Sequence, residues 1–123
     1  MKGERKYFMS ELTDELALYG VDVKGTMDRF DDDEELYKSC LKVFLEDENF
    51  NHLKDLSLKK QYSDAFTYAH ALKGMVINLG ITPLADILDK TEEYVKQEND
   101  KELNNLIPKL FHKIQQLKYI MNK

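Results

Sequence analysis

The sequence predicts an all-α fold: an antiparallel up-and-down four-helix bundle with an additional N-terminal helix and a short connecting helix. Apolar residues recur at three- and four-residue steps along most of the 123 residues, which is the period of a helix face. Only five Gly and two Pro interrupt the chain, and they fall between these segments. No segment shows sustained alternation of apolar and polar residues, and short connections between helices favour antiparallel neighbours.

Length and composition favour one domain over residues 1–123, with an N-terminal helix and loop in residues 1–25 and the bundle in residues 26–123. The net charge of -5 provides no positive field that would hold a nucleic acid. The single cysteine, Cys40, excludes an internal disulfide, a CxxC pair and a four-thiolate zinc site. No apolar run approaches the roughly 18 residues of a membrane span, and no hydrophobic signal region follows the basic start. We therefore expect a cytoplasmic monomer that binds neither nucleic acid nor membrane.

The first predicted helix spans residues 4–19. Its apolar stripe consists of Phe8, Leu12, Leu16 and Tyr19. Gly20 is expected to end this helix, because glycine takes the left-handed conformation at little cost. Residues 21–25 then read as a loop, and Thr26 is expected to cap a short turn that holds Met27 and Phe30.

The run Asp31-Asp32-Asp33 has two interpretations, a metal site or the N-terminus of a helix. We favour the helix, since aspartate caps followed by Glu34 and Glu35 match the positive end of the helix dipole. The expected apolar stripe consists of Leu36, Cys40, Val43, Phe44, Leu53 and Leu56. The polar stretch 46–51 predicts a bend within this region, and Cys40 is expected to be an inert core residue.

Three further helical stretches follow along the chain. One covers residues 61–79 and is expected to end at Gly80. Thr82 is expected to cap the next, with Pro83 at its first position and an apolar stripe of Leu84, Ile87, Leu88 and Tyr94. The last begins after Asn99-Asp100 and carries Leu110, Ile114, Leu117 and Met121. Because Pro108 has no N–H to donate, a kink or restart is expected near residues 105–108.

His70 is expected to point away from the core of the helix 61–79. Successive residues turn by about 100°, which places an apolar cluster on the opposite side, namely Ala65, Leu72, Val76 and Leu79. A lone histidine in an apolar helix is usually a satisfied core residue, but this angular position excludes that interpretation. The face of His70 carries Ser63, Phe66, Thr67, Lys73, Gly74 and Ile77.

The neighbours of His70 indicate a nucleophile presented to another protein. Gly74 lies one turn away, and its cost of about 1 kcal/mol relative to alanine in a helix is offset if another molecule must approach the imidazole closely. Lys73 can swing its ammonium toward a group attached to the ring. Large apolar side chains on this face indicate a docking patch. The patch is expected to comprise Ser63, Phe66, Thr67 and Ile77.

Phosphoryl transfer is the chemistry that fits this face. An exposed imidazole is largely unprotonated at neutral pH and can attack phosphorus. The phosphoryl group brings about two negative charges, which Lys73 can partly offset. Such transfer depends on positioning and electrostatics, often with Mg²⁺. The sequence has no P-loop, kinase signature or convincing metal site, so we expect no cofactor of its own and place Mg²⁺ on the partner.

The segment His70–Gly80, His-Ala-Leu-Lys-Gly-Met-Val-Ile-Asn-Leu-Gly, resembles the signature of histidine-containing phosphotransfer (HPt) domains. In that family His-x-x-Lys-Gly is followed by a small or polar residue and Leu-Gly. Three upstream segments also occur in the order and approximate spacing of the family: Gly20–Val23, Met27–Phe30 and Asp33–Tyr37. The resemblance extends from about residue 15 to the C-terminus.

This resemblance implies a four-helix bundle that relays phosphoryl groups between aspartates of receiver domains. By motif position, His70 is the phosphoacceptor, Lys73 the phosphate-stabilising cation and Gly74 the small residue that gives access. The implied partners are response-regulator receiver domains or a hybrid sensor histidine kinase. With no ATP-binding domain, the chain would be a phosphocarrier and not an enzyme. It departs from the family at Phe66 and Thr67, where members often carry basic or polar residues.

Two alternatives remain. One is a helical adaptor that binds a receiver or kinase domain through the same surface and is never phosphorylated. The other is a soluble enzyme with a site in the bundle core, against which the lack of convergent polar residues on the apolar stripes argues. His52 and His112 have no Lys-Gly after them and are expected to be surface residues, and Asn78 is expected to be peripheral.

Overall fold

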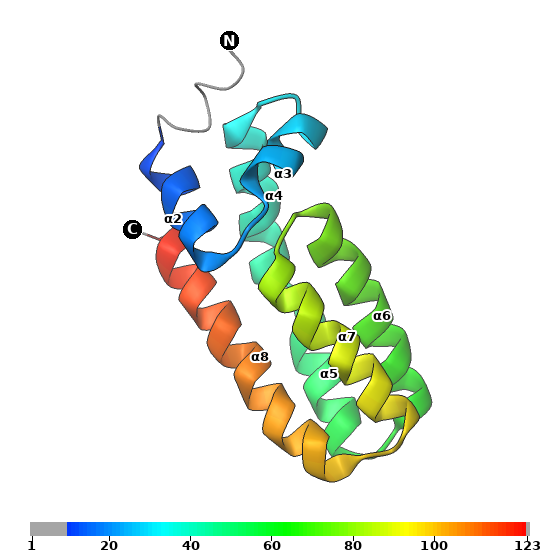
Figure 1. Cartoon of the computed structure of the whole chain (residues 1–123). Coiled ribbons are helices and arrows are strands. Elements are labelled where there is room, and N and C mark those ends of the chain that lie inside the picture. Colours follow the sequence, from blue (N-terminus) through cyan, green and yellow to red (C-terminus); the bar gives the residue numbers. More distant parts are fainter. Residues whose placement is uncertain (1–9, 123) are drawn as a thin grey trace.

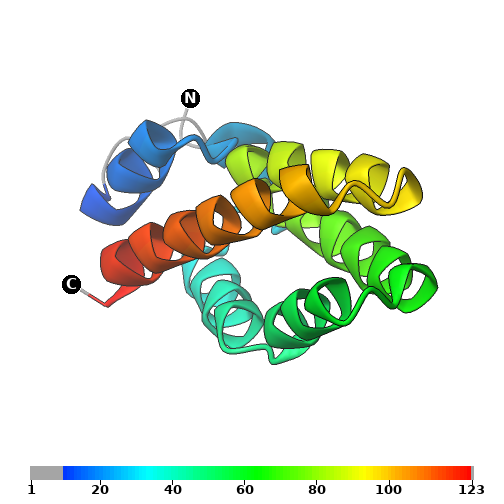
Figure 2. The same cartoon turned by 90° about the horizontal axis from the view of Figure 1, so that it is seen from below.

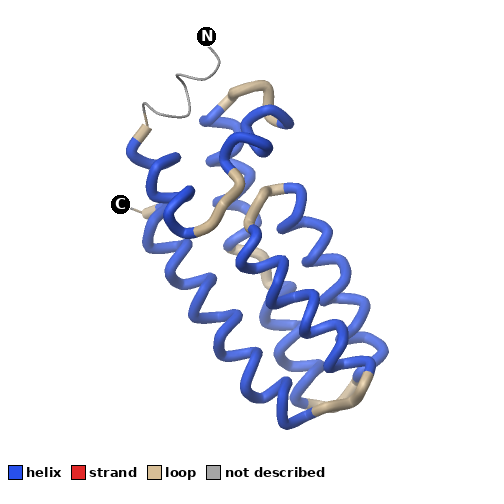
Figure 3. The backbone as a smooth tube through the Cα atoms, in the orientation of Figure 1, coloured by secondary structure: helices blue, strands red, loops and turns tan. Residues whose placement is uncertain are grey.

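The computed structural model describes residues 10–122, and every helix or strand assigned within that range is an α-helix (Figures 1 and 3). The helices are α2 (Glu11–Tyr19), α3 (Val23–Arg29), α4 (Glu34–Leu45), α5 (Asn49–Leu58), α6 (Tyr62–Asn78), α7 (Thr82–Lys96) and α8 (Asp100–Met121). The predicted all-α class is therefore confirmed. Two parts of the prediction, the helix start at residue 4 and the position of Phe8, lie outside the described residues.

The helices α5, α6, α7 and α8 lie side by side, and successive ones run in opposite directions (Figure 1). α6 packs against α5 and α7, and α8 packs against α7 and α5. α4 precedes α5, from which the break at residues 46–48 separates it, and it also contacts α8. α2 packs against α8 near the C-terminus (Figure 2).

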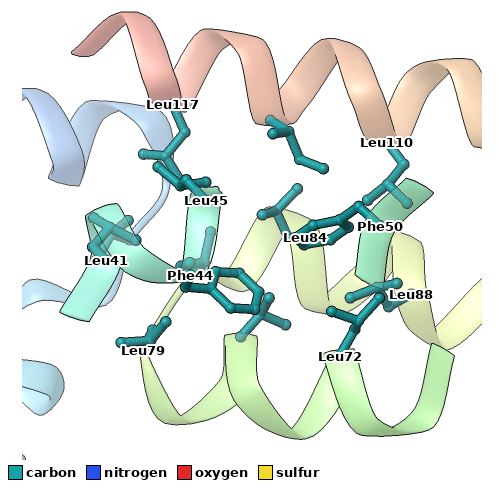
Figure 4. Packing of buried hydrophobic residues seen from close by; sticks show 14 of the residues in the cluster. Leu41, Phe44, Leu45, Phe50, Leu72, Leu79, Leu84, Leu88, Leu110 and Leu117 are labelled. Carbon is teal, nitrogen blue, oxygen red and sulfur yellow. The ribbon is translucent and has the colours of Figure 1, made fainter. Parts of the chain in front are cut away.

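The buried side chains form one apolar cluster between these helices (Figure 4). At one end, Leu72 of α6 and Leu88 of α7 face Leu110 of α8. Nearer the middle, Phe44 and Phe50 pack edge to face with ring centres 5.2 Å apart. This contact joins α4 to α5 across their bend, so the two helices bury one continuous apolar surface.

The connection after α2 is only partly as predicted. Gly20 ends the helix at a φ of 123° and donates its N–H to the carbonyl of Leu16 at 3.1 Å. The loop expected over residues 21–25 is wrong, because α3 begins at Val23. Asp22 caps it by accepting a hydrogen bond from the N–H of Gly25 at 3.2 Å. The cap therefore comes four residues earlier than expected, and Thr26 is buried inside the helix.

The start of α4 is as predicted, but its buried face is not. Asp33 caps the helix by accepting from the N–H of Leu36 at 3.0 Å. Leu36 and Val43 are exposed, and Cys40 is half-buried at the edge of the core. The residues that α4 buries are Tyr37, Leu41, Phe44 and Leu45. Both sets have helical spacing, and the buried one brings the Tyr37 hydroxyl within 2.8 Å of the Leu79 carbonyl oxygen.

The later apolar stripes agree with the sequence more closely. Leu53 of α5 is buried and Leu56 half-buried. In α7, Leu84 and Leu88 are buried, whereas Ile87 and Tyr94 are half-buried. The buried residues of α8 include all four predicted, Leu110, Ile114, Leu117 and Met121.

Two local predictions at α7 and α8 are wrong. Thr82 is the first residue of α7 and not its cap, since Ile81 precedes the helix without a side-chain cap. α8 continues through Pro108 without the expected restart. Pro108 and Asn104 are both exposed, so water can satisfy the Asn104 carbonyl that the proline leaves free. Among residues 10–122, no helix is both long and apolar enough to span a bilayer.

Candidate functional site

The candidate site lies on the face of α6 that is turned away from the core. The buried residues of this helix are Ala65, Ala69, Leu72 and Val76. His70 lies on the other side, and its side chain is 67% exposed. The imidazole is therefore accessible from solvent near the middle of a 17-residue helix.

The predicted docking residues occupy the same face but are spread along it. Ser63, Thr67 and Ile77 are exposed, and Phe66 is half-buried. The Phe66 ring stacks on the His70 ring, with centres 5.9 Å apart and planes 12° apart. Ser63 and Ile77 each lie two turns from His70, at opposite ends of the patch. The structure therefore brings Phe66 against the histidine and leaves the other three around it.

Gly74 leaves open space one turn from His70. A Cβ atom placed on this residue would meet no heavy atom within 4 Å. Packing inside the protein therefore does not require a glycine at this position. Because glycine has no side chain, nothing projects from this residue beside the imidazole, and a bulky partner can approach the ring closely.

Glu92 of α7 is the main residue that sequence reasoning missed. Its Oε2 atom lies 3.2 Å from Nδ1 of His70, and its side chain is only 11% exposed. Because a carboxylate only accepts hydrogen bonds, this contact assigns the hydrogen to Nδ1, and in the neutral ring Nε2 then keeps its lone pair. The site thus holds the imidazole in the tautomer whose free nitrogen is Nε2.

A signal for Glu92 was present in the sequence. The apolar stripe of α7 has Leu84 and Leu88 at four-residue steps, and the next position on that stripe is Glu92. A carboxylate that interrupts a buried stripe needs hydrogen-bonding partners. Its partners are His70 and Lys73, both on the neighbouring helix.

Lys73 is held by two carboxylates of α7. Its Nζ donates to Oδ1 of Asp89 at 3.1 Å and to Oε1 of Glu92 at 3.2 Å. These hydrogen bonds, first that to Asp89 and then that to Glu92, raise the pKa of the Lys73 ammonium above its ordinary value. The ammonium is therefore charged and already partnered, whereas the sequence suggested a side chain that can swing toward a group attached to the ring. Asp89, like Glu92, was missed from sequence.

A second cation from α7 lies beside Phe66. Nζ of Lys96 is 6.0 Å from the centre of the Phe66 ring, which stacks on His70. The sequence lacks a basic residue at positions 66 and 67 of α6. Lys96 places a positive charge in that area from the adjacent helix, which local sequence reasoning could not have foreseen.

The end of the histidine motif is held by the upstream segments. Nη2 of Arg29 donates to the Asn78 carbonyl at 2.9 Å and to the Ile77 carbonyl at 3.3 Å. The Tyr37 hydroxyl donates to the Leu79 carbonyl at 2.8 Å. The bonds to Asn78 and Leu79 satisfy carbonyls that a helix end leaves without backbone partners, whereas the Ile77 carbonyl also accepts from the N–H of Gly80 at 3.0 Å. The segments containing Arg29 and Tyr37 thus meet the motif in space and anchor the C-terminal end of α6.

An apolar hollow of about 440 Å³ lies between α4 and the C-terminal part of α6. It is lined by Ser39, Cys40, Val43, Phe44, Asp47, Met75, Asn78 and Leu79. Val43 and Met75 are exposed at this surface. On the α6 side its lining begins at Met75, the residue directly after Gly74, and reaches Leu79.

The remaining candidates do not converge on a second site. His52 and His112 are exposed surface residues. Within residues 10–122, no three His, Cys, Asp or Glu side chains are grouped so that they could hold a metal ion. No family model, curated protein or solved structure matches the chain.

Proposed function

We propose that this chain is a histidine phosphotransfer protein. It relays a phosphoryl group between receiver-domain aspartates in a multistep two-component phosphorelay, through phosphohistidine at His70. The observation that carries the proposal is the exposed imidazole of His70, with Nδ1 on the Glu92 carboxylate and open space at Gly74. The resemblance of the His70–Gly80 segment to the HPt signature supports the same function.

The transfer step follows from the tautomer of His70. The Nε2 lone pair attacks the phosphorus of an aspartyl phosphate, so an N–P bond forms while the P–O bond to the aspartyl carboxylate breaks. The carboxylate leaves with the electron pair, and the ring becomes an imidazolium that still carries the Nδ1 hydrogen. Glu92, at 3.2 Å, stabilises this positive charge. The reverse attack by the aspartate of a second receiver passes the group on.

The other components come from the partner. Mg²⁺ is expected on the receiver domain, where it offsets phosphoryl charge. The partners are response-regulator receiver domains or a hybrid sensor histidine kinase. They dock on Ser63, Phe66, Thr67 and Ile77 and on the apolar hollow beside them. The chain itself acts as a cytoplasmic, monomeric phosphocarrier without kinase activity of its own.

The proposal includes a finer description of the fold. The antiparallel up-and-down four-helix bundle consists of α4 continued by α5, then α6, α7 and α8. In this description α2 is the additional N-terminal helix and α3 the short connecting helix. Residues 1–123 form a single HPt-like domain.

The alternative is an adaptor that binds the same partners and is never phosphorylated. The apolar hollow beside α6 would serve such a protein equally well. Binding that tolerates His70→Ala, with no phosphate incorporated, would favour the adaptor.

The test is incubation of the protein with a set of phosphorylated receiver domains. We expect transfer of label to give an acid-labile phosphoramidate, and the His70→Gln variant to remain unlabelled. His52→Gln is the matched control, because His52 is also an exposed helical histidine, and it should be labelled like the wild type. Equal labelling of His70→Gln would refute the assignment.

A further inference from the structure

Asp89 forms an ion pair that the transfer step does not require. Its Oδ1 accepts from Nζ of Lys73 at 3.1 Å, and its side chain is 71% exposed. Lys73 is itself only 21% exposed. Glu92 already holds both His70 and Lys73, so the position of the imidazole does not depend on Asp89.

The charges around His70 are unfavourable for a phosphoryl group. Lys73 contributes one positive charge, and the carboxylates of Asp89 and Glu92 contribute two negative charges next to it. A phosphoryl group on Nε2 adds about two more negative charges. Glu92 is needed opposite the imidazolium, so Asp89 is the carboxylate that competes with the phosphoryl group for Lys73.

We infer that Asp89 shortens the lifetime of the phosphohistidine by competing for the Lys73 ammonium. This inference rests on the proposed function and concerns the regulation of the same site. Asp89 is then a positioning residue that acts through Lys73. Its effect is that the phosphoryl group leaves His70 more readily. The hydrogen bond to Asp89 is also the main cause of the raised pKa of Lys73.

Asp89→Asn should lengthen the phosphohistidine half-life. The substitution removes a negative charge near the phosphoryl group and leaves Glu92 as the carboxylate paired with Lys73. We expect an effect of roughly 3- to 10-fold at low salt for charges several ångströms apart near a surface. The difference should shrink as salt is added, because Asp89 is exposed to solvent.

The experiment labels the full chain with phosphoramidate, which needs no partner protein. The P–N bond of phosphoramidate breaks, an N–P bond forms at Nε2 of His70, and ammonia leaves. After the donor is removed, phosphorus NMR follows the loss of phosphohistidine by hydrolysis in the wild type and in Asp89→Asn. Asp86→Asn is the matched control, since Asp86 is an exposed aspartate one turn earlier on α7, and its half-life should equal that of the wild type.

Two results would overturn the inference. One is a half-life in Asp89→Asn equal to that of the wild type. The other is an undiminished effect of Asp89→Asn when Lys73 is already Ala, which would mean that Asp89 does not act through Lys73. If instead the wild type is not phosphorylated at His70, the proposed function itself fails, and the inference with it.

Discussion

Nδ1 of His70 lies 3.2 Å from Oε2 of Glu92, across the interface between α6 and α7. Neighbouring pairs follow the same antiparallel register: Lys73 with Asp89, Phe66 with Lys96, and Tyr62 with Asp100, at the start of α8. Four residues of α6 are therefore paired, in one register, with side chains of α7 or the start of α8. This register determines which nitrogen of His70 is free.

Glu92→Gln should slow phosphoryl transfer to His70 while leaving the fold intact. Glutamine has the size of glutamate and keeps one of the two acceptor oxygens, but it cannot stabilise the imidazolium by charge. Loss of one charge-assisted hydrogen bond predicts a decrease of roughly tenfold. Rapid-quench measurement of transfer from a phosphorylated receiver tests this, with Glu93→Gln as the control because Glu93 is exposed beside it. Equal rates for both variants would remove Glu92 from the mechanism.

Gly74→Ala should stabilise the protein and slow phosphoryl transfer from receiver domains. The added Cβ meets no atom within 4 Å, so the helix gains about 1 kcal/mol from the better propensity of alanine. Urea denaturation measures the gain. Transfer from a receiver domain should slow, whereas labelling by the small molecule phosphoramidate should not. If receiver transfer proceeds at the wild-type rate, Gly74 does not provide access.

Gly80→Ala should have the opposite effect on stability. Gly80 has a φ of 74°, and a Cβ there would collide with the hydroxyl of Thr26. A backbone in this region together with the collision should cost at least about 1 kcal/mol. The same urea experiment measures it, and a variant as stable as the wild type would show that the turn after α6 can rearrange freely.

Tyr62→Phe should alter the response of the protein to acid. The Tyr62 hydroxyl donates to Oδ1 of Asp100 at 2.7 Å, and this bond is the main reason that the pKa of Asp100 is lowered. An acid with a lowered pKa in the folded state contributes stability above its ordinary pKa, and that contribution is lost as the pH falls through the lowered value. Without the hydroxyl, the pKa of Asp100 should rise, and the loss of stability in acid should become smaller.

Carboxyl NMR titration of Asp100 in the wild type and in Tyr62→Phe measures this change directly. The same hydrogen bond is the main cause that raises the pKa of Tyr62 to about 12. For a tyrosine with a raised pKa the pH dependence of stability is opposite to that of the acid. The contribution of Tyr62 to stability is present below pH 10 and is lost as the pH rises through about 12. An Asp100 pKa that is unchanged in Tyr62→Phe would contradict both statements.

Features that depend on residues close together in the chain were predicted well. Gly20 and Gly80 end their helices and Asp33 begins one, because a cap needs only the local backbone and one side chain. The exposed position of His70 followed from its angle to the apolar residues of the same helix. The cap of α3 is an exception, because Thr26 was expected to cap a short turn whereas Asp22 caps the helix and Thr26 lies inside it.

The buried face of α4 could not be chosen from its sequence. Leu36 with Val43 and Tyr37 with Leu41 belong to two apolar stripes of similar spacing. A rotation of about 100° exchanges one stripe for the other. The contacts of Tyr37 with the end of α6 and of Phe44 with Phe50 exist only in the packed molecule, and they determine which stripe is buried.

For the histidine site, the sequence alone predicts an exposed histidine on the outer face of a helix, with a lysine and a glycine one turn away. Spacing along one helix is enough for this, because helix geometry is the same wherever the helix packs. The pairing with Glu92, Asp89 and Lys96 comes from tertiary structure. Those residues lie 16 to 30 positions further along the chain, and only the register of α7 against α6, set by burial of their apolar faces, brings them to His70, Lys73 and Phe66.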